Sequence, residues 1–309
     1  MNIRIGTRGS ALALWQAEWV KGRLLDSRPD LDIELVLIKT SGDKILDVPL
    51  AMVGGKGLFV KEIEEALLDQ KIDLAVHSMK DMPVTLPDDL MIGALPKRET
   101  PWDVLVSRNN LLFKDIPKGS RIGTSSLRRS AQIRHIRPDI EIVPLRGNLD
   151  TRLRKLKTEE LDAIVLAAAG IERLGWKDQI TEYLKPELML PAIAQGAIGV
   201  EIRRSDTFVR ELVAKLNHPE TETIVSGERA FLRRLEGGCQ IPIAALGNIF
   251  GDSFELTGLV AEVDGSNIIR QSISGPAGQS ESLGIELAEQ LLEAGADKIL
   301  SKLLGASTL

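Results

Sequence analysis

Arginine side chains are concentrated in one stretch near the middle of the chain. Residues 121–154 contain eight of the 22 arginines and three acidic residues, but no lysine. A guanidinium is a planar fork that grips a carboxylate or phosphate with two hydrogen bonds, which an ammonium group cannot do. The net charge of −5 hides this cationic segment, because residues 219–309 carry 13 acidic and six basic residues. The composition therefore predicts a site for one or more anions in the middle segment.

Four predicted loops carry basic or hydroxyl side chains at the ends of strands. They are residues 7–10, 78–81, 124–129 and 146–148. Open α/β sheets bind ligands at the carboxyl ends of their strands, where helix N-termini add free N–H donors and a positive dipole end. We expect an anion site there, whereas Arg134 and Arg137 are expected on solvated helix faces. Residues 54–57, Gly-Gly-Lys-Gly, lack the spacing of a phosphate-binding P-loop and favour a mobile lid or hinge.

Two residues stand out as candidates for chemistry, and each also has a purely structural interpretation. Asp81 follows Lys80 at the end of a predicted strand, where a carboxylate among bases could stabilise a transient cation or relay a proton. An aspartate at this position is equally typical of a turn or helix cap. Cys239 is the only cysteine and follows two glycines, which suits covalent attachment or nucleophilic chemistry. A free cysteine is otherwise most often a small buried hydrophobe.

The elements that would position these residues alternate between strand and helix over the first two thirds of the chain. Helical segments begin near Ser10, Phe59, Ser126 and Asp150. Strands are expected at residues 3–6, 33–38, 73–79, 121–124, 140–143 and 162–168. Such alternation predicts an α/β architecture with largely parallel sheets.

The last ~90 residues have a different pattern. A helix over 220–235 leads to the Gly-Gly-Cys segment, a hairpin is expected over 254–272, and a long helix follows from 280 to about 294. This pattern predicts a small C-terminal α+β domain. Plausible boundaries lie near residues 96–101, 191–196 and 218–219, where prolines and glycines gather.

Several classes of protein are disfavoured by composition alone. One cysteine cannot form an intrachain disulfide, and three scattered histidines with one cysteine provide no metal-ligand cluster, so no metal site is expected. No apolar stretch approaches the ~20 residues of a membrane helix, and the first residues lack the apolar region of a signal peptide. The expectation is a cytoplasmic protein of more than one domain with no membrane contact.

Specific motifs occur in order along nearly the whole chain. They lie at 6–8, 14–17, 53–62, 75–83, 122–129, 145–148, 151–153, 191–196 and 235–240. In these motifs, above all His-Ser-Met-Lys-Asp at 77–81 and Gly-Gly-Cys-Gln at 237–240, the chain resembles the porphobilinogen deaminase family, also called hydroxymethylbilane synthase. The family joins four porphobilinogen units head to tail, releases one ammonia from each, and frees the linear tetrapyrrole hydroxymethylbilane by hydrolysis.

The resemblance implies a role for each matching residue. A covalent dipyrromethane cofactor would be held through a thioether to Cys239, and Asp81 would be the catalytic carboxylate that stabilises the cationic pyrrole nitrogens of the azafulvene intermediate. The cofactor carboxylates would be bound by Lys80, Thr124, Ser126, Arg128, Arg129, Arg146 and Arg152. The substrate would be bound by Arg8, Ser10, Arg146, Arg152 and Arg173. Lys56 and Phe59 would belong to a mobile loop beside the active site.

The resemblance also implies three domains. The first two would resemble type II periplasmic binding proteins with a cleft between them, over residues 1–98 with 197–217 and residues 99–196. The third would be the C-terminal α+β domain, residues 218–309, which carries the cofactor cysteine. The family is expected to act as a monomer on porphobilinogen alone.

Two other classes of function remain as alternatives. A non-enzymatic anion-binding protein of similar α/β build would give Cys239 no special role and carry no covalent mass. A nucleic-acid binder would use the arginine segment, but the net charge of −5 and the single tyrosine argue against it.

Overall fold

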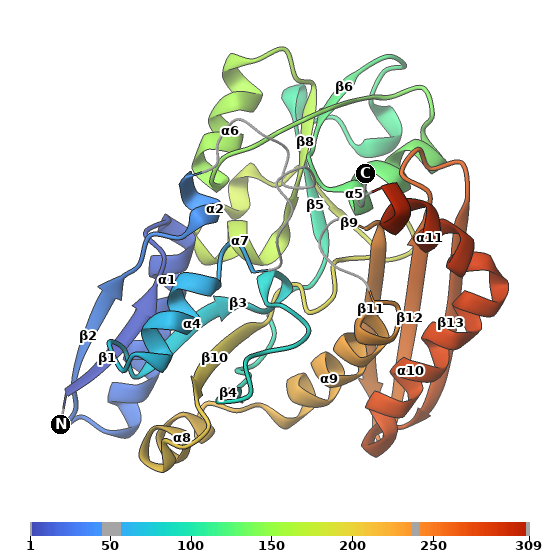
Figure 1. Ribbon diagram of the computed structural model, residues 1–309. Coiled ribbons are helices and arrows are strands. Elements are labelled where there is room, and N and C mark those ends of the chain that lie inside the picture. The colour runs from blue at the N-terminus through green and yellow to red at the C-terminus, as the bar shows by residue number, and fades with distance from the viewer. Residues whose placement is uncertain (1, 45–56, 237–240, 307–309) are drawn as a thin grey trace. The chain divides into compact units, whose positions relative to one another are not determined.

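The computed structural model describes residues 2–44, 57–236 and 241–306, and its chain divides into two compact units (Figure 1). The first unit comprises residues 1–99 and 196–222, and the second comprises residues 100–195 and 223–309. The α/β class is confirmed, because each unit is built on a five-stranded sheet covered by helices, and a small three-stranded α+β part completes the second unit.

The first unit has a mixed sheet in the order β2-β1-β3-β10-β4. Its strands are β1 (Asn2–Thr7), β2 (Asp32–Leu37), β3 (Leu74–Ser78), β4 (Leu90–Ala94) and β10 (Ile198–Arg203). Its helices are α1 (Ala11–Ser27), α2 (Ser41–Lys44), α4 (Lys61–Leu68), α8 (Thr207–Ala214) and the 3-10 turn η1 (Met79–Asp81). All strands run parallel except β10, which is antiparallel to both neighbours.

Side-chain alternation along the strands gives this sheet two apolar faces. Leu74 and Val76 of β3 pack with α1 and α8, whereas Ala75 packs with Ile63 and Leu67 of α4 on the other face. Residues two apart on a strand share a face. His77 therefore lies on the α4 face, a position that matters below.

The second unit has a sheet in the order β7-β6-β8-β5-β9. Its strands are β5 (Asp103–Ser107), β6 (Arg121–Gly123), β7 (Glu141–Val143), β8 (Ala163–Ala167) and β9 (Glu182–Leu184). Its helices are α5 (Leu127–Ile136), α6 (Leu149–Thr158) and α7 (Ala168–Arg173), with the 3-10 turns η2 (Arg108–Asn110), η3 (Phe113–Asp115) and η4 (Lys177–Gln179). Strands β6, β7 and β8 are parallel, and β5 is antiparallel to β8 and β9.

The C-terminal part of the second unit is the antiparallel sheet β11-β12-β13 with its helices. Its strands are β11 (Ile243–Phe250), β12 (Ser253–Ala261) and β13 (Ile268–Pro276). Its helices are α9 (Pro219–Arg234), the 3-10 turn η5 (Ala277–Gln279), α10 (Ser280–Leu291), the π turn η6 (Leu292–Ala296) and α11 (Asp297–Ala306). The predicted hairpin is confirmed. The predicted helix over 280–294 is confirmed too, because helical backbone continues from α10 into η6 and is interrupted at Gly295, whose φ is 107°.

The three-stranded sheet is attached to the rest of the second unit by a small apolar core. Ala131 of α5 and Leu190 pack with side chains of β11 and β12. At the β12–β13 turn, Gly265 has a φ of +75°, and a Cβ there would lie 2.6 Å from the Ala131 carbonyl oxygen. Only glycine permits this close approach. The approach also lets the Gly265 carbonyl lie 3.0 Å from Nδ1 of His135 on α5.

Candidate functional site

A pocket in the first unit gathers several of the predicted residues. It is lined by Arg8, Ser10, Phe59, Ser78 and Asp81, together with His77 and apolar side chains of α1. Strands β1 and β3 are parallel neighbours, so the loops that follow Thr7 and Ser78 leave the same edge of the sheet. This confirms that two of the four predicted loops lie together at the carboxyl ends of strands.

The N-terminus of α1 forms one wall of this pocket. Ser10 is the N-cap, and its hydroxyl oxygen accepts a hydrogen bond from the Ala13 amide at 3.3 Å. Thr7 is fully buried and donates its hydroxyl hydrogen to the Ala13 carbonyl at 3.1 Å. The first turn of α1 is thereby held against the end of β1.

Arg8 is already engaged by two neighbours. Its Nε and Nη2 donate to Asp43 of α2, and its guanidinium carbon lies 4.2 Å from the centroid of the Phe59 ring. Although burial opposes ionisation, hydrogen bonds from Arg8 and Thr40 hold the pKa of the Asp43 carboxyl below its usual value. These bonds leave Nη1 of Arg8 as the donor without a partner among the described residues.

Asp81 presents an unengaged carboxylate to the pocket. It is the last residue of η1, it is half-buried, and no residue in 2–44, 57–236 or 241–306 forms a hydrogen bond or ion pair with its side chain. Lys80, in the same turn, is also half-buried. A carboxylate that is sheltered but uncommitted can interact with a cationic ligand group without first breaking an internal bond.

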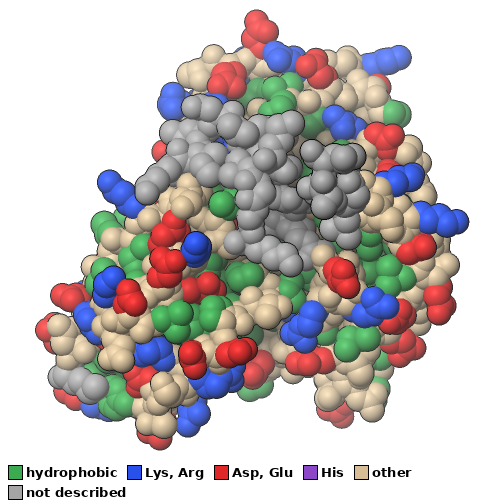
Figure 2. Space-filling model, viewed as in Figure 1, with side chains coloured by type: hydrophobic (Ala, Val, Ile, Leu, Met, Phe, Trp, Pro, Cys, Tyr) green, Lys and Arg blue, Asp and Glu red, His purple; other side chains and the backbone are tan. Residues whose placement is uncertain are grey.

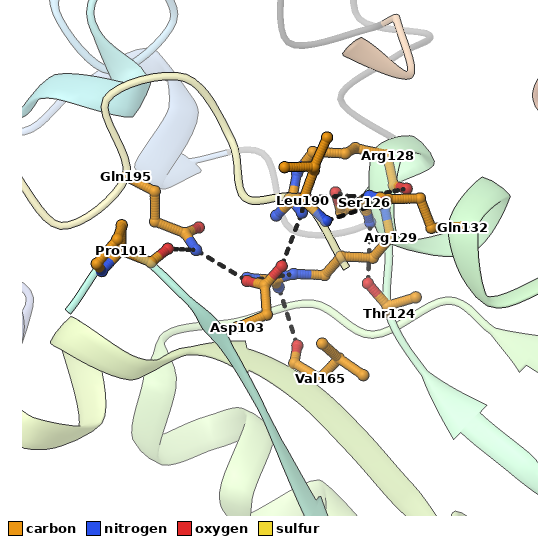
Figure 3. Close-up of polar contacts among 10 residues, drawn as sticks. All are labelled: Pro101, Asp103, Thr124, Ser126, Arg128, Arg129, Gln132, Val165, Leu190 and Gln195. Carbon is orange, nitrogen blue, oxygen red and sulfur yellow. Dashed lines mark hydrogen bonds and ion pairs between the residues drawn. The ribbon is translucent and has the colours of Figure 1, made fainter. Parts of the chain in front are cut away.

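Two of the predicted anion-binding residues of the second unit, Arg128 and Arg129, meet around a residue that was not predicted. Asp103, the first residue of β5, is fully buried and accepts hydrogen bonds from Arg128, Arg129 and Gln195 (Figure 3). The Nη1 of Arg128 and the Nη2 of Arg129 each lie 2.7 Å from the carboxylate oxygens. We call Asp103 and these three residues the Asp103 cluster. Burial would raise the pKa of Asp103, but the two guanidiniums hold it far below the usual range.

Arg128 and Arg129 differ in how much of each guanidinium is engaged internally. Arg129 donates from Nε and Nη2 to Asp103 and from Nη1 to the Val165 carbonyl at 2.9 Å, so all three of its nitrogens are engaged. Arg128 uses only Nη1, which donates to Asp103 and to the Leu190 carbonyl. Its Nε and Nη2 have no partner in the described part of the chain. Arg128 is therefore the member of the pair that can grip an external carboxylate, and Arg129 helps to hold the cluster together.

Hydroxyl side chains order the loop before α5. Ser126 is the N-cap, and its hydroxyl oxygen lies 3.5 Å from the Arg129 amide, while the Ser126 amide donates to the Thr124 hydroxyl at 3.2 Å. Ser125, which was not among the predicted site residues, accepts from the Leu145 amide at 2.9 Å and donates to the Leu145 carbonyl. It joins this loop to the one that carries Arg146, and both loops leave the same edge of the sheet because β6 and β7 are parallel.

Arg146 directly precedes Gly147 in the sequence, and Arg152 follows it by five residues. Arg146 is half-buried and has no hydrogen-bond or ion-pair partner within the described ranges. The Nε of Arg152 donates to the Gly147 carbonyl at 2.8 Å. Gly147 has a φ of +110°, and a Cβ there would lie 2.5 Å from Thr151, so a side chain at this position would distort the turn that orients both arginines.

The other predicted arginines have varied surroundings. Arg173 is buried at the end of α7. The expectation that Arg134 and Arg137 lie on solvated helix faces was wrong, because both are half-buried and bind backbone carbonyls. Arg134 donates to the Val263 carbonyl, and Arg137 donates to those of Phe113 and Ile116 as well as to Asp139.

Two predicted residues, Cys239 and Lys56, lie outside the described residues. Asp103 and Gln195 were missed by sequence reasoning, although Gln195 stands within one of the family motifs. The available signal for Asp103 was an acid at the start of an apolar run, Val104 to Val106, whose nearest bases, Arg98 and Arg108, lie five residues away in sequence. Such an acid, if buried, requires a cation from elsewhere in the fold.

Comparisons with known proteins cover nearly the whole chain. The family model described as "Porphobilinogen deaminase, dipyromethane cofactor binding domain" matches residues 3–211, and "Porphobilinogen deaminase, C-terminal domain" matches residues 223–293. Porphobilinogen deaminase of Geobacter metallireducens is 57% identical over 301 residues, which are 97% of this chain and 94% of the relative. That of Syntrophotalea carbinolica is 56% identical over 301 residues, covering 97% of this chain and 96% of the relative.

Solved structures give a weaker likeness. The methionine-binding protein MetQ is 15% identical with a TM-score of 0.43, covering 70% of this chain and 89% of its own. An ancestral cationic amino acid solute-binding protein is 14% identical with a TM-score of 0.44, covering 70% and 87%. Among the described residues, no helix is long and apolar enough to cross a membrane. The same residues contain no group of three or more metal-binding side chains.

The Asp103 cluster predicts a specific acid sensitivity. Asp103→Asn leaves two buried guanidiniums without a counter-charge, and we expect the free energy of unfolding at neutral pH to fall by about 3–5 kcal/mol. Because the folded-state pKa of Asp103 is lowered, its contribution is present above the unfolded-state pKa of about 3.9 and is lost as the pH falls below it. Urea unfolding should therefore show that the difference in free energy of unfolding between wild type and variant becomes smaller below about pH 4.

The matched control is Asp115→Asn, an exposed aspartate in the same unit. It should stay within about 0.5 kcal/mol of wild type at neutral pH. An Asp103→Asn protein as stable as this control at neutral pH would show that the ion pairs do not hold the unit together.

Proposed function

The chain belongs to the porphobilinogen deaminase family, and on this premise we propose that it is the transferase of tetrapyrrole biosynthesis that makes hydroxymethylbilane. It would join four porphobilinogen molecules head to tail, release four molecules of ammonia, and free the linear tetrapyrrole by hydrolysis. The observation that carries this proposal is the consecutive match of two family models over residues 3–211 and 223–293. The uncommitted carboxylate of Asp81 and the partly engaged arginines support it independently.

The residues of the second unit fit a carboxylate-rich cofactor. Each ring of a dipyrromethane carries an acetate and a propionate side chain, so the group needs several cationic donors. Arg128 and Arg146 have nitrogens without partners in the described part of the chain. A hydrogen bond between charged groups is worth about 1.5–3 kcal/mol, so two such donors suffice to position one ring. When bound through Cys239, the dipyrromethane supplies the ring to which the first substrate unit is joined.

Within the second unit we assign different tasks to the predicted residues. Arg128, Arg146 and Arg152 would bind carboxylates directly, and Thr124 and Ser126 would add hydroxyl donors beside the N-terminus of α5. Arg129 would act mainly by fixing Arg128 through Asp103, since its three nitrogens are engaged. Arg173 of this unit and Lys80 of the first unit complete the set of proposed binding residues.

Within the first unit, the pocket suits an incoming substrate ring. Nη1 of Arg8 and the Ser10 hydroxyl are placed to bind a carboxylate at the N-terminus of α1, where the helix dipole also favours an anion. Asp81 would assist loss of the amino group by stabilising positive charge on the pyrrole nitrogen as it develops. Phe59, stacked on Arg8, would cover one side of the ring.

We further propose that the protein acts as a cytoplasmic monomer with porphobilinogen as its small-molecule substrate and no nucleic-acid partner. On the face shown in Figure 2, basic and acidic side chains are interspersed rather than gathered into a broad basic area. A nucleic-acid surface would gather basic residues along one face. A non-enzymatic anion-binding protein would share the arginines but would have no covalent group on Cys239.

Intact-protein mass spectrometry tests the covalent cofactor. We expect purified wild-type protein to be heavier than its polypeptide by the mass of one dipyrromethane, because Cys239 is the only thiol in the chain. Cys239→Ser should show the bare polypeptide mass and no turnover of porphobilinogen. Wild-type protein that is active at the bare polypeptide mass would contradict the proposal.

Asp81→Asn tests the catalytic carboxylate. The amide keeps the size of the side chain but removes the charge that would stabilise the developing cation, so turnover should fall by about 10²–10³-fold. Initial rates of product formation measure this effect, while the intact mass and thermal unfolding should match the wild type. Asp89→Asn, at an exposed aspartate of the same unit, should leave the rate unchanged. A near-normal rate in Asp81→Asn would remove Asp81 from the central role.

A further inference from the structure

Three titratable residues of the first unit have no role in the reaction as proposed so far, and they are the buried His77 and Glu201 and the half-buried Glu64. His77 lies on β3 and Glu201 on the neighbouring strand β10, and Nε2 of His77 is 3.0 Å from Oε2 of Glu201. In the antiparallel register, Gly199 is opposite His77 and Glu201 is opposite Ala75, so the two side chains form a diagonal pair on one face of the sheet. This is the face covered by α4.

The third residue, Glu64, comes from α4. The Oε1 atoms of Glu64 and Glu201 are both buried without a hydrogen-bond partner, and Glu201 is fully buried. Two carboxylates and one imidazole in such a setting carry an unfavourable excess of negative charge if each acid ionises. Glu64 therefore retains its proton more readily than a glutamate in water.

The surrounding charges do not supply a cation to relieve this excess. Helix α4 packs against β1, β3 and β10. From β1, Arg4 is paired with Asp73, and in the loop that follows, Arg8 is paired with Asp43. From β10, Arg203 is paired with Asp73 and Asp206. Among the described residues, the charges that act on Glu64 are those of Glu201 and His77. Burial, followed by the charge of Glu201, raises the pKa of Glu64 to about 7, whereas His77 opposes the shift.

His77 connects these acids to the pocket. It is among the residues that line the pocket with Ser78 and Asp81, and it is 6% exposed. Its Nε2 is occupied by Glu201, and its Nδ1 has no partner among the described residues. A histidine held at one nitrogen by a carboxylate has its other nitrogen oriented for proton exchange.

We propose that Glu64, His77 and Glu201 form a buried proton relay that serves the Asp81 pocket, with His77 as the member that exchanges protons with the pocket. This inference rests on the proposed function. The relay deepens it by assigning an acceptor for the proton that each condensation releases.

The proton balance of one condensation shows what the relay would do. The nitrogen of the aminomethyl group is in its ammonium form when the C–N bond breaks, and the electron pair of that bond leaves with the nitrogen as ammonia. A new C–C bond forms from that carbon to the free ring carbon of a second pyrrole unit, and this ring carbon then loses its hydrogen as a proton to restore aromaticity. Nδ1 of His77 takes up the proton, with the carboxylates behind it stabilising the imidazolium. The proton then leaves with ammonia as ammonium, so the relay returns to its starting state.

The experiment combines a structural and a kinetic readout on the holoenzyme. The chain has three histidines, so ¹⁵N-histidine NMR gives few signals, and His135→Gln and His218→Gln assign that of His77 by elimination. Glu64→Gln removes the charge that Glu64 carries above about pH 7, so the titration midpoint of His77 should move to lower pH by up to about one unit. The acid limb of the kcat–pH profile should move in the same direction by the same amount.

Glu65→Gln is the matched control, because Glu65 is the next residue on α4 but its side chain is 58% exposed. It should leave both the midpoint and the profile at their wild-type positions. If the His77 midpoint does not move in Glu64→Gln, the two groups are not coupled and the relay is wrong. If the midpoint moves but the kcat profile does not, the cluster is structural and the relay is again wrong.

The failure of the relay can be told apart from that of the proposed function. Wild-type holoenzyme that converts no porphobilinogen would contradict both the proposed function and the relay. Normal conversion by wild type, combined with unchanged kcat profiles in Glu64→Gln, would remove the relay alone.

Discussion

The arrangement of charge in the second unit depends on the buried carboxylate of Asp103. Burying one ionised carboxylate costs several kcal/mol, and burying two guanidiniums beside it costs more. The structure offsets this cost with direct bonds from Arg128 and Arg129 and a third from Gln195. Asp103 accepts a hydrogen bond from only one nitrogen of Arg128. The side chain is thereby held in place, while its Nε and Nη2 have no partner among the described residues. A flexible, solvated arginine would lose conformational entropy when its ligand binds, whereas Arg128 is already ordered.

The Asp103 cluster is connected to the C-terminal sheet by hydrogen bonds of the 191–196 loop. Gln195 follows Ala194, whose amide donates to the fully buried Glu228 of α9 at 2.6 Å. The other oxygen of Glu228 accepts from the Gly247 amide of β11. Two buried acids, Asp103 and Glu228, thus hold consecutive residues of one loop. Helix α9 leads into the segment that contains Cys239, so the chain that would carry the cofactor is tied to the residues that would bind its carboxylates.

The first unit uses charge in the opposite way. In the second unit Asp103 binds two arginines. In the first unit, Asp81 has no side-chain partner among the described residues, and Arg8 binds Asp43 through two of its three nitrogens. The buried His77–Glu201 pair and the neighbouring Glu64 lie beside this pocket. In the proposed relay, they would exchange protons with the pocket rather than supply a fixed charge. Under the proposed function, binding and chemistry would therefore depend on different arrangements of charge.

Much of the fold and part of the site could be predicted from the sequence. The strands that carry the four loops were predicted within about two residues, because apolar runs flanked by turn residues are local signals. The antiparallel strands β5 and β10 were not, since their pairing depends on distant segments. Sequence also could not tell Arg128 from Arg129, because the carboxylate that distinguishes them lies 25 residues away. The predicted exposure of Arg134 and Arg137 was wrong for the same reason, since the carbonyls that they bind belong to loops distant in sequence.

The most direct test of this account is the amount of covalent cofactor on Asp103→Asn protein that remains folded and monodisperse. If Asp103 positions Arg128 for the cofactor carboxylates, intact mass spectrometry should show most of this protein at the bare polypeptide mass. Turnover per total protein should then be lower by about tenfold or more, while Asp115→Asn stays fully loaded. Asp103→Asn protein that is fully loaded and turns over porphobilinogen at the wild-type rate would contradict the central role of this carboxylate.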